Sequence, residues 1–328
     1  MVNETPKMQP SATPAPPVPA PAPSAPSDDA DQPGPLLKLW YFIEYLAAVT
    51  AFFIISIIPL SLVLALADGV ARVVFFCWRT RREIAVDNLL QSRVCATPSE
   101  ARRMALAAFR NFTYMVVETI VARRRITDAN WDQHVKLQLS PAAEKLLREP
   151  GRGIIVASAH LGNWEVVAHA AARFKPMCVI YRPFNNPYLE RVAHARRSGE
   201  NIRFVSRNER SPMRFLQSLV NGEILALMID QAVITDRVSV EFFGRPAWTT
   251  KAVAMMHLTT RAPLVAAFAV RTGPLRYEVR AVGPIACPRT GDREKDAFEI
   301  TQALTREIEK IVREFPEQYL WGHKRWQK

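Results

Sequence analysis

The sequence predicts an α/β fold, in which helices flank a mixed sheet and an N-terminal membrane helix precedes the sheet. Two observations carry this prediction. Residues 45–67 form an uncharged apolar run, and strand-like and helix-like segments alternate after residue 150, as is typical of layered α/β domains. The 328 residues suffice for one large domain or two small ones. We expect a disordered tail at 1–35, a membrane anchor at 36–78 and the main domain at 79–328.

The first region is dominated by Pro, Ala, Ser and Asp and holds 11 of the chain's 25 prolines. It has almost no large apolar side chains to offset the entropy of ordering, so we expect a disordered, partly polyproline tail. A cationic start followed directly by an apolar run is missing, which argues against a signal peptide.

The apolar run at 45–67 is long enough, at about 1.5 Å per helical residue, to cross a hydrocarbon core of about 30 Å. Trp40, Tyr41 and Tyr45 lie at its start, where interfacial aromatic side chains are expected. Pro59 should kink the helix, which membrane helices tolerate. A buried core helix, or a helix that lies in or re-enters the interface, is the alternative.

The charges around this run predict its orientation. Four arginines follow it, and under the positive-inside rule they place the main domain in the cytoplasm; they are Arg72, Arg79, Arg81 and Arg82. The four cysteines are scattered, so the sequence predicts neither a disulfide framework nor a zinc site, in keeping with a reducing compartment. The net charge of +12 predicts an acidic partner, which could be nucleic acid, an anionic membrane surface or an acidic carrier protein.

The main domain begins with helices and continues as strands and helices in turn. Apolar residues recur at helical spacing over 81–125, and Pro98 and Ser99 divide this region into two helices, with Thr97 or Ser99 as N-cap. The arginines of this region form either a solvated face or, as we favour, a face against anionic lipid headgroups. Strands are expected at 153–159, 177–181, 202–205, 223–230, 263–270 and 277–282, and helices at 164–173, 187–198, 211–222, 251–260 and 294–314.

The segment HLGNWE, from His160 to Glu165, directly follows a predicted buried strand. Reactive groups gather beyond the carboxyl ends of strands in such sheets. Gly162 permits a tight turn, so that Glu165 can reach one imidazole nitrogen, fix its tautomer and leave the other nitrogen to accept a proton. The spacing alone is a weak signal, because 31 acidic residues are present, and a strand-end histidine that caps a helix is the structural alternative.

Five motifs in order make a stronger signal: HLGNWE, then YRPFNNP (181–187), MIDQ (228–231), VEFFGRPAWTTKA (240–252) and FPEQYLWGHKRW (315–326). Over residues 36–326 the chain resembles the lauroyl and myristoyl acyltransferases of lipid A biosynthesis, which belong to the lysophospholipid acyltransferase superfamily with its His-x4-Asp/Glu signature. The resemblance implies a glycerolipid-acyltransferase-like fold and an enzyme of the bacterial inner membrane with its catalytic domain on the cytoplasmic side. It implies acyl transfer from acyl carrier protein to a hydroxyl of a lipid A precursor.

Matched residue by residue, the resemblance implies that His160 is the base and Glu165 its partner. It implies that substrate is bound by Asn163, Arg182, Arg197, Asp230, Gln231 and Arg245, with Arg196 as the alternative to Arg197. Structural alternatives remain at two positions: Arg182 could pair with a nearby carboxylate, and Asp230 could cap a turn. No metal, cofactor or nucleic acid is expected.

Two other functions stay open. One is acyl transfer to another acceptor, such as an amino-lipid, a glycolipid or a lysophospholipid. A Pro-Glu-Gly-Thr block is absent, which argues against the glycerol-3-phosphate or lysophosphatidate acceptors of related enzymes. The other is a non-catalytic membrane adaptor, which would tolerate changes at both His160 and Glu165.

Overall fold

The computed structural model describes residues 34–328, apart from 198, 200, 208–212, 288 and 327–328. By its contacts the chain divides into Met1–Trp40 and a large compact unit, Tyr41–Lys328. Residues 1–33 of the predicted disordered tail lie outside the described part.

A seven-stranded sheet forms the centre of the molecule, in the order β1-β9-β8-β2-β5-β3-β4. All neighbouring strands are parallel except β8 and β9, so the sheet is mixed, as predicted. The strands are β1 (Val135–Leu139), β2 (Ile154–Ser158), β3 (Met177–Tyr181), β4 (Ile202–Ser206), β5 (Ile224–Met228), β8 (Leu264–Gly273) and β9 (Arg276–Val282).

Helices cover both faces of this sheet, and the side chains of β2 show how. Ile155 and Ala157 point into a core shared with α11, whereas Ile154 and Val156 point into a core shared with α7. Because side chains alternate along a strand, a central strand covered on both faces is apolar throughout, which explains the continuous run in the sequence. The helices of the domain are α5 (Trp131–His134), α6 (Pro141–Arg148), α7 (Trp164–Ala172), α8 (Pro187–Arg197), α9 (Met213–Val220), α10 (Ala252–Thr260) and α11 (Arg293–Glu314).

The apolar N-terminal region forms two helices, α1 (Pro35–Ile57) and α2 (Leu60–Cys77), where the sequence predicted one kinked helix. Pro59 separates them with an extended backbone, φ −55° and ψ 139°. A proline has no N–H to donate and disfavours the helical conformation of the residue before it, so the first helix ends here. Each helix is long and apolar enough to cross a membrane by length and composition.

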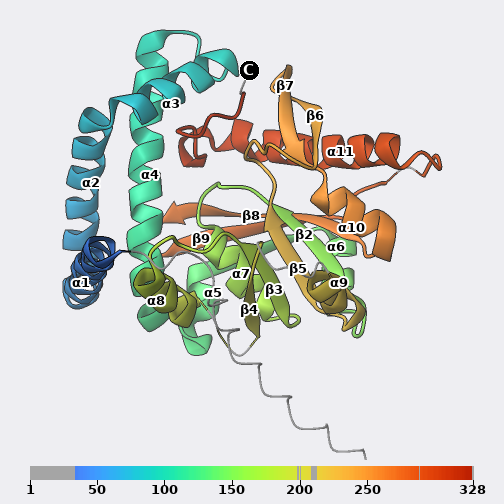
Figure 1. The fold of residues 1–328 in the computed structure, drawn as a ribbon, viewed down its shortest axis with the longest axis horizontal. Helices are drawn as coiled ribbons and strands as arrows, with labels where there is room; N and C mark the ends of the chain where they lie inside the picture. Colours follow the sequence, from blue (N-terminus) through green and yellow to red (C-terminus); the bar gives the residue numbers. More distant parts are fainter. Residues whose placement is uncertain (1–33, 198, 200, 208–212, 288, 327–328) are drawn as a thin grey trace, which may run out of the picture. The chain divides into compact units, whose positions relative to one another are not determined.

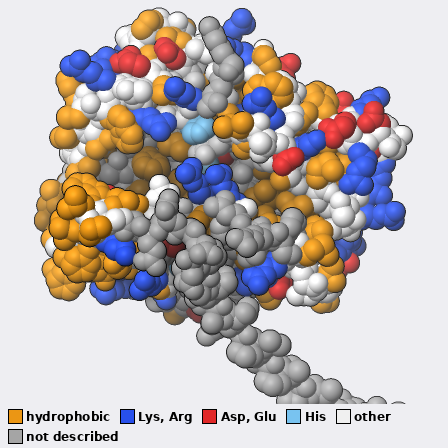
Figure 2. Space-filling model, in the orientation of Figure 1, with side chains coloured by type: hydrophobic (Ala, Val, Ile, Leu, Met, Phe, Trp, Pro, Cys, Tyr) orange, Lys and Arg blue, Asp and Glu red, His pale blue; other side chains and the backbone are white. Residues whose placement is uncertain are grey.

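Helix α2 packs along α4 (Pro98–Arg125), and α3 (Arg79–Gln91) connects them (Figure 1). Thr97 caps α4 in a reciprocal capping box with Glu100, as one of the two predicted caps. On the outer sides, large apolar side chains of both α1 and α2 are exposed, and they gather at the lower left of Figure 2. The side chains that α2 buries recur every four residues and form one face: Val63, Ala67, Ala71 and Phe75.

A two-stranded antiparallel hairpin, β6 (Arg237–Phe242) and β7 (Arg245–Thr250), lies outside the main sheet and packs on α11 (Figure 1). Phe242 and Phe243 at its tip are buried among the aromatic side chains of the C-terminal segment, which we define as residues 315–326. The hairpin thereby covers the C-terminal segment.

Candidate active site

His160 follows β2, and Asp230 follows β5, the strand beside it. The Nδ1 atom of His160 lies 2.8 Å from Oδ1 of Asp230, and the backbone N–H of His160 donates to Oδ2 over 3.0 Å. The carboxyl ends of adjacent parallel strands meet at one edge of the sheet, which explains why residues 70 positions apart pair so closely. Asp230 is almost fully buried and His160 is partly exposed.

This contact fixes the chemistry of the imidazole. A buried carboxylate accepts from the N–H at Nδ1, so that the lone pair of neutral His160 lies at Nε2. Burial alone raises the pKa of Asp230, but the charge and hydrogen bonds of His160, together with the charge of Arg325, lower that pKa overall. Nε2 of Gln231 lies 3.4 Å from Nε2 of His160, so Gln231 is brought to the face of the imidazole that would accept a proton.

Glu165 lies in the first turn of α7 and turns to another partner. Its Oε1 atom lies 2.9 Å from Nε of Arg197, at the end of α8. Burial raises the pKa of Glu165, and the charge and hydrogen bond of Arg197 oppose that rise. The spacing suggested that Glu165 accepts from the His160 ring, but in the structure Asp230 accepts from it, because the helix directs the Glu165 carboxylate toward α8 while the neighbouring strand directs Asp230 at the ring.

The turn between His160 and Glu165 is tightly packed. Gly162 has φ +57°, and a Cβ atom added there would lie 1.9 Å from the carbonyl oxygen of Ala269. The side chain of Asn163 is buried, with contacts to the hydroxyl groups of Thr119 and Tyr277 at 3.4 Å each. These contacts hold the Asn163 side chain within the loop, and its role in substrate binding stays a prediction.

The remaining predicted residues lie in different surroundings. Arg182 follows β3, is exposed and has no hydrogen bond or ion pair within the described part of the chain. Arg245 begins β7, where it donates to Gln91 of α3 and stacks 5.2 Å from the Trp326 ring. Arg196 stacks on Phe52 of α1, 4.8 Å from the ring centroid, so Arg197 is the arginine of this pair that reaches Glu165.

The C-terminal segment closes over the His160 loop, which the sequence analysis did not predict. The backbone N–H of Leu320 donates to the His160 carbonyl over 3.0 Å, and that of Gly162 donates to the Gln318 carbonyl over 3.0 Å. Arg325 is buried and donates to the Trp248 carbonyl and the Thr249 hydroxyl, over 2.7 and 2.6 Å. The aromatic and basic composition of the segment was the available signal, and it does not say which surface the segment packs against.

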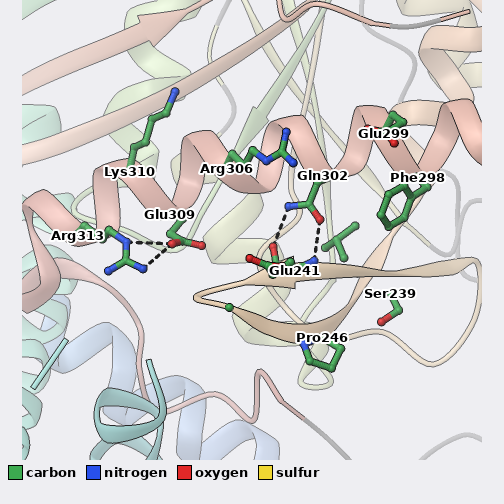
Figure 3. Close-up of a pocket in the computed structure, with 12 residues that line it drawn as sticks. Ser239, Glu241, Pro246, Phe298, Glu299, Gln302, Arg306, Glu309, Lys310 and Arg313 are labelled. Carbon is green, nitrogen blue, oxygen red and sulfur yellow. Dashed lines mark hydrogen bonds and ion pairs between the residues drawn. The ribbon is translucent and has the colours of Figure 1, made fainter. Parts of the chain in front are cut away.

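A separate cavity of about 580 Å³ lies between the β6–β7 hairpin and α11 (Figure 3). Inside it, the Gln302 amide bonds both the N–H and the carbonyl of Glu241, and Glu309 pairs with Arg313 over 2.6 Å. The Gln302 bonds fasten the hairpin to the helix, whereas the Glu309–Arg313 pair lies within α11. None of the predicted site residues lines this cavity. Among the described residues no cluster of three His, Cys, Asp or Glu side chains is arranged to hold a metal ion.

Known bacterial proteins are similar to this chain over most of its length. The chain is 24% identical over 301 residues to the lipid A biosynthesis lauroyltransferase of Escherichia coli K12, which covers 89% of this chain and 93% of that protein. It is also 24% identical over 257 residues to the lipid A biosynthesis palmitoleoyltransferase of the same organism, covering 76% and 79%. The bacterial lipid A biosynthesis acyltransferase family matches residues 34–328. The chain therefore belongs to the bacterial lipid A biosynthesis acyltransferase family.

Proposed function

We propose that this acyltransferase moves a fatty acyl chain from acyl carrier protein to a hydroxyl of a lipid A precursor, with His160 as general base and Asp230 as the group that orients it. The observation that carries the proposal is the 2.8 Å contact between Asp230 and Nδ1 of His160. It leaves Nε2 as the proton acceptor, and no serine or cysteine nucleophile is needed if the base activates the hydroxyl of the acceptor itself.

In this mechanism Nε2 of His160 removes the proton of the acceptor hydroxyl as its oxygen attacks the thioester carbonyl. Asp230 stabilises the imidazolium that forms. The tetrahedral intermediate then collapses, the carbon–sulfur bond breaks, and the imidazolium returns the proton to the departing thiolate. The proton and the electron pairs balance without a cofactor. General-base assistance of this kind is typically worth about 10²–10⁴ in rate.

Phosphates of the lipid A precursor would be held by Arg182 and Arg197. A guanidinium carries five N–H donors, and Glu165 engages the one at Nε of Arg197, so the others remain for a ligand. Arg182 has no described ion pair that a phosphate would have to displace. In this proposal Glu165 acts on the substrate through Arg197 and not on the base.

The apolar helices α1 and α2 would bind the inner membrane, with the catalytic domain on the cytoplasmic side. Their outer faces expose large apolar side chains, and arginines follow α2. Protease added to cells with a permeabilised outer envelope should leave the catalytic domain intact. Digestion there would contradict this orientation. The net charge of +12 suits both an anionic membrane and the acidic acyl carrier protein.

Mass spectrometry of lipid A from a strain that lacks the gene tests the whole proposal. We expect the loss of one acyl chain, restored by the wild-type gene but not by His160→Ala or Asp230→Asn copies. Equal amounts of each variant in the membrane fraction are the control. Unchanged lipid A in the deletion strain, together with no transfer by the purified protein to a lipid A precursor, would refute the proposed acceptor.

A further inference from the structure

We propose that His323 is a second substrate-contacting histidine of this site, whose neutral imidazole donates an N–H to the oxyanion that develops on the thioester carbonyl. The inference rests on the function proposed above and deepens it, because that mechanism leaves the oxyanion without a named partner. It follows from the position of the C-terminal segment, from the buried face of the His323 ring and from the charges around it.

The backbone around His323 is held on both sides. One side is the His160 loop, where Leu320 N–H donates to the His160 carbonyl over 3.0 Å. The other side is α3, where the buried Asn88 carboxamide donates to the carbonyls of Trp321 and His323, over 2.7 Å each. A third bond, 2.9 Å long, runs from Arg81 to the Gly322 carbonyl. A segment fastened in this way presents its side chains in a fixed direction, as a preorganised site requires.

The His323 ring has two different edges. Its Nδ1 atom is buried and has no hydrogen-bond partner in the described part of the chain, whereas the residue as a whole is partly exposed. A proton on Nδ1 would therefore bury an unpaired donor, which is costly. The favoured neutral tautomer carries its proton on Nε2, at the open edge. His323 thus offers an N–H donor and not a second base.

Burial, more than the surrounding charges, keeps this ring neutral. Burial lowers the pKa of His323; Asp230 opposes that change, while His160, Arg81 and Arg325 add to it. These charged groups lie at the two strand ends, on α3 and in the segment of His323 itself. The same segment contacts both members of the proposed catalytic pair, because the Tyr319 hydroxyl lies 3.5 Å from the Asp230 carbonyl oxygen and the Leu320 N–H bonds the His160 carbonyl. A neutral imidazole can polarise a carbonyl without giving up its proton.

The reaction can then be written with every atom in place. His160 takes the proton of the acceptor hydroxyl, the hydroxyl oxygen bonds the thioester carbon, and the carbonyl π electrons move to oxygen. The N–H at Nε2 of His323 donates to this oxyanion and keeps its proton. When the carbon–sulfur bond breaks, the carbonyl re-forms and His160 returns its proton to the thiolate. Gln231 is the competing donor, since its amide lies 3.4 Å from Nε2 of His160.

The test compares steady-state kinetics of the full-length protein with acyl carrier protein thioester and lipid A precursor in mixed micelles. We expect His323→Ala to lower kcat by about 10²–10³, the usual cost of one oxyanion donor, with KM for both substrates nearly unchanged. His323→Gln supplies an amide N–H and should recover at least about tenfold of that loss. His257→Ala is the matched control, because His257 also has a buried ring nitrogen without a partner among the described residues but lies in α10.

Three results would overturn the inference. His323→Ala could keep more than about a third of wild-type kcat, His323→Gln could be no better than His323→Ala, or His257→Ala could lose as much as His323→Ala.

Nitrogen-15 NMR of the folded wild type gives a readout without turnover. At about pH 7.5, above the ordinary histidine pKa of about 6.5, we expect neutral His323 with its proton on Nε2. A charged ring or a proton on Nδ1 would also overturn it. If the wild type transfers no acyl chain, the proposed function fails and this role falls with it; if it does and only the His323 results disagree, the inference fails alone.

Discussion

Replacing Asp230 by Asn tests which carboxylate orients the histidine. Both oxygens of Asp230 are in use, one at Nδ1 of His160 over 2.8 Å and one at its backbone N–H over 3.0 Å. An asparagine can keep only one of these acceptors. If its oxygen stays on the backbone N–H, its NH₂ group faces Nδ1 and favours the tautomer in which Nε2 carries the proton and cannot act as a base.

The expected loss follows from this tautomer exchange. The same substitution in the Ser-His-Asp triad of serine proteases leaves the geometry intact and lowers kcat by about 10⁴, and we expect a similar loss here. Glu165→Gln should cost less in kcat and act mainly on KM for the lipid acceptor. It breaks the ion pair with Arg197 but leaves the imidazole and its partner in place.

The assay is the initial rate of acyl transfer in mixed micelles, with His160→Ala as the floor and circular dichroism as the check of folding. The reasoning is refuted if Asp230→Asn keeps more than about a tenth of wild-type kcat while Glu165→Gln falls to the His160→Ala floor. That result would return the supporting role to Glu165, and it would mean that the two side chains rearrange when substrate binds.

Three further predictions concern the frame of the site. Glu118 is fully buried and accepts from Arg271, from the Leu275 N–H and from the Tyr277 hydroxyl. Glu118→Ala should destabilise the fold by about 3–5 kcal/mol, because Arg271, whose side chain is only 15% exposed, would lose its charged partner. A loss of unfolding free energy below about 1 kcal/mol in denaturant titration would contradict this prediction. Gly162→Ala should abolish activity and lower Tm, because the added Cβ would clash with the Ala269 carbonyl. Gly151 has a similar φ but open space around it, so Gly151→Ala should cost only the backbone strain of about 1–2 kcal/mol. Equal effects of the two substitutions would rule out the steric argument. Folding lowers the pKa of Asp230, so the ionised Asp230 carboxylate stabilises the fold fully above its unfolded pKa of about 3.9, and this stabilisation is lost as pH falls from there toward the folded pKa. Asp230→Asn should therefore make Tm fall less steeply with pH in this acid range. An unchanged slope of Tm against pH would contradict this prediction.

The sequence predicts most of the sheet because its central strands are apolar on both faces. Strands β2, β5 and β8 are continuous apolar runs and were all expected. Strand β1 was not, because it lies at the edge of the sheet, and only Val135 of its five residues is fully buried. The β6–β7 hairpin was also missed. This hairpin is held by distant parts of the chain: strand β6 packs on helix α11, and the buried Phe242 ring packs against Trp326 of the C-terminal segment. Such contacts leave no periodic pattern in the local sequence.

The partner of His160 could not be predicted from spacing for a related reason. A fixed spacing such as His160 to Glu165 reports which residues are near in the chain. The contact with Asp230 depends on β5 lying next to β2, which only the strand order of the folded sheet establishes. The sequence singled out both residues, and Arg197 with them, but in the structure their neighbours differ from those that the spacing suggested. Their roles in catalysis and substrate binding stay predictions.

The C-terminal segment connects the proposed chemistry to the proposed membrane contact. Helix α2 buries one apolar face on α4 and leads directly into α3. Helix α3 holds the segment through Asn88 and Arg81, and the segment in turn holds the His160 carbonyl. Only Trp78 separates the apolar helix from α3. The position of His160 therefore depends on a chain of hydrogen bonds that begins beside the exposed apolar surface. In the proposed mechanism, this connection would hold the base and the membrane-bound acceptor in fixed positions relative to each other.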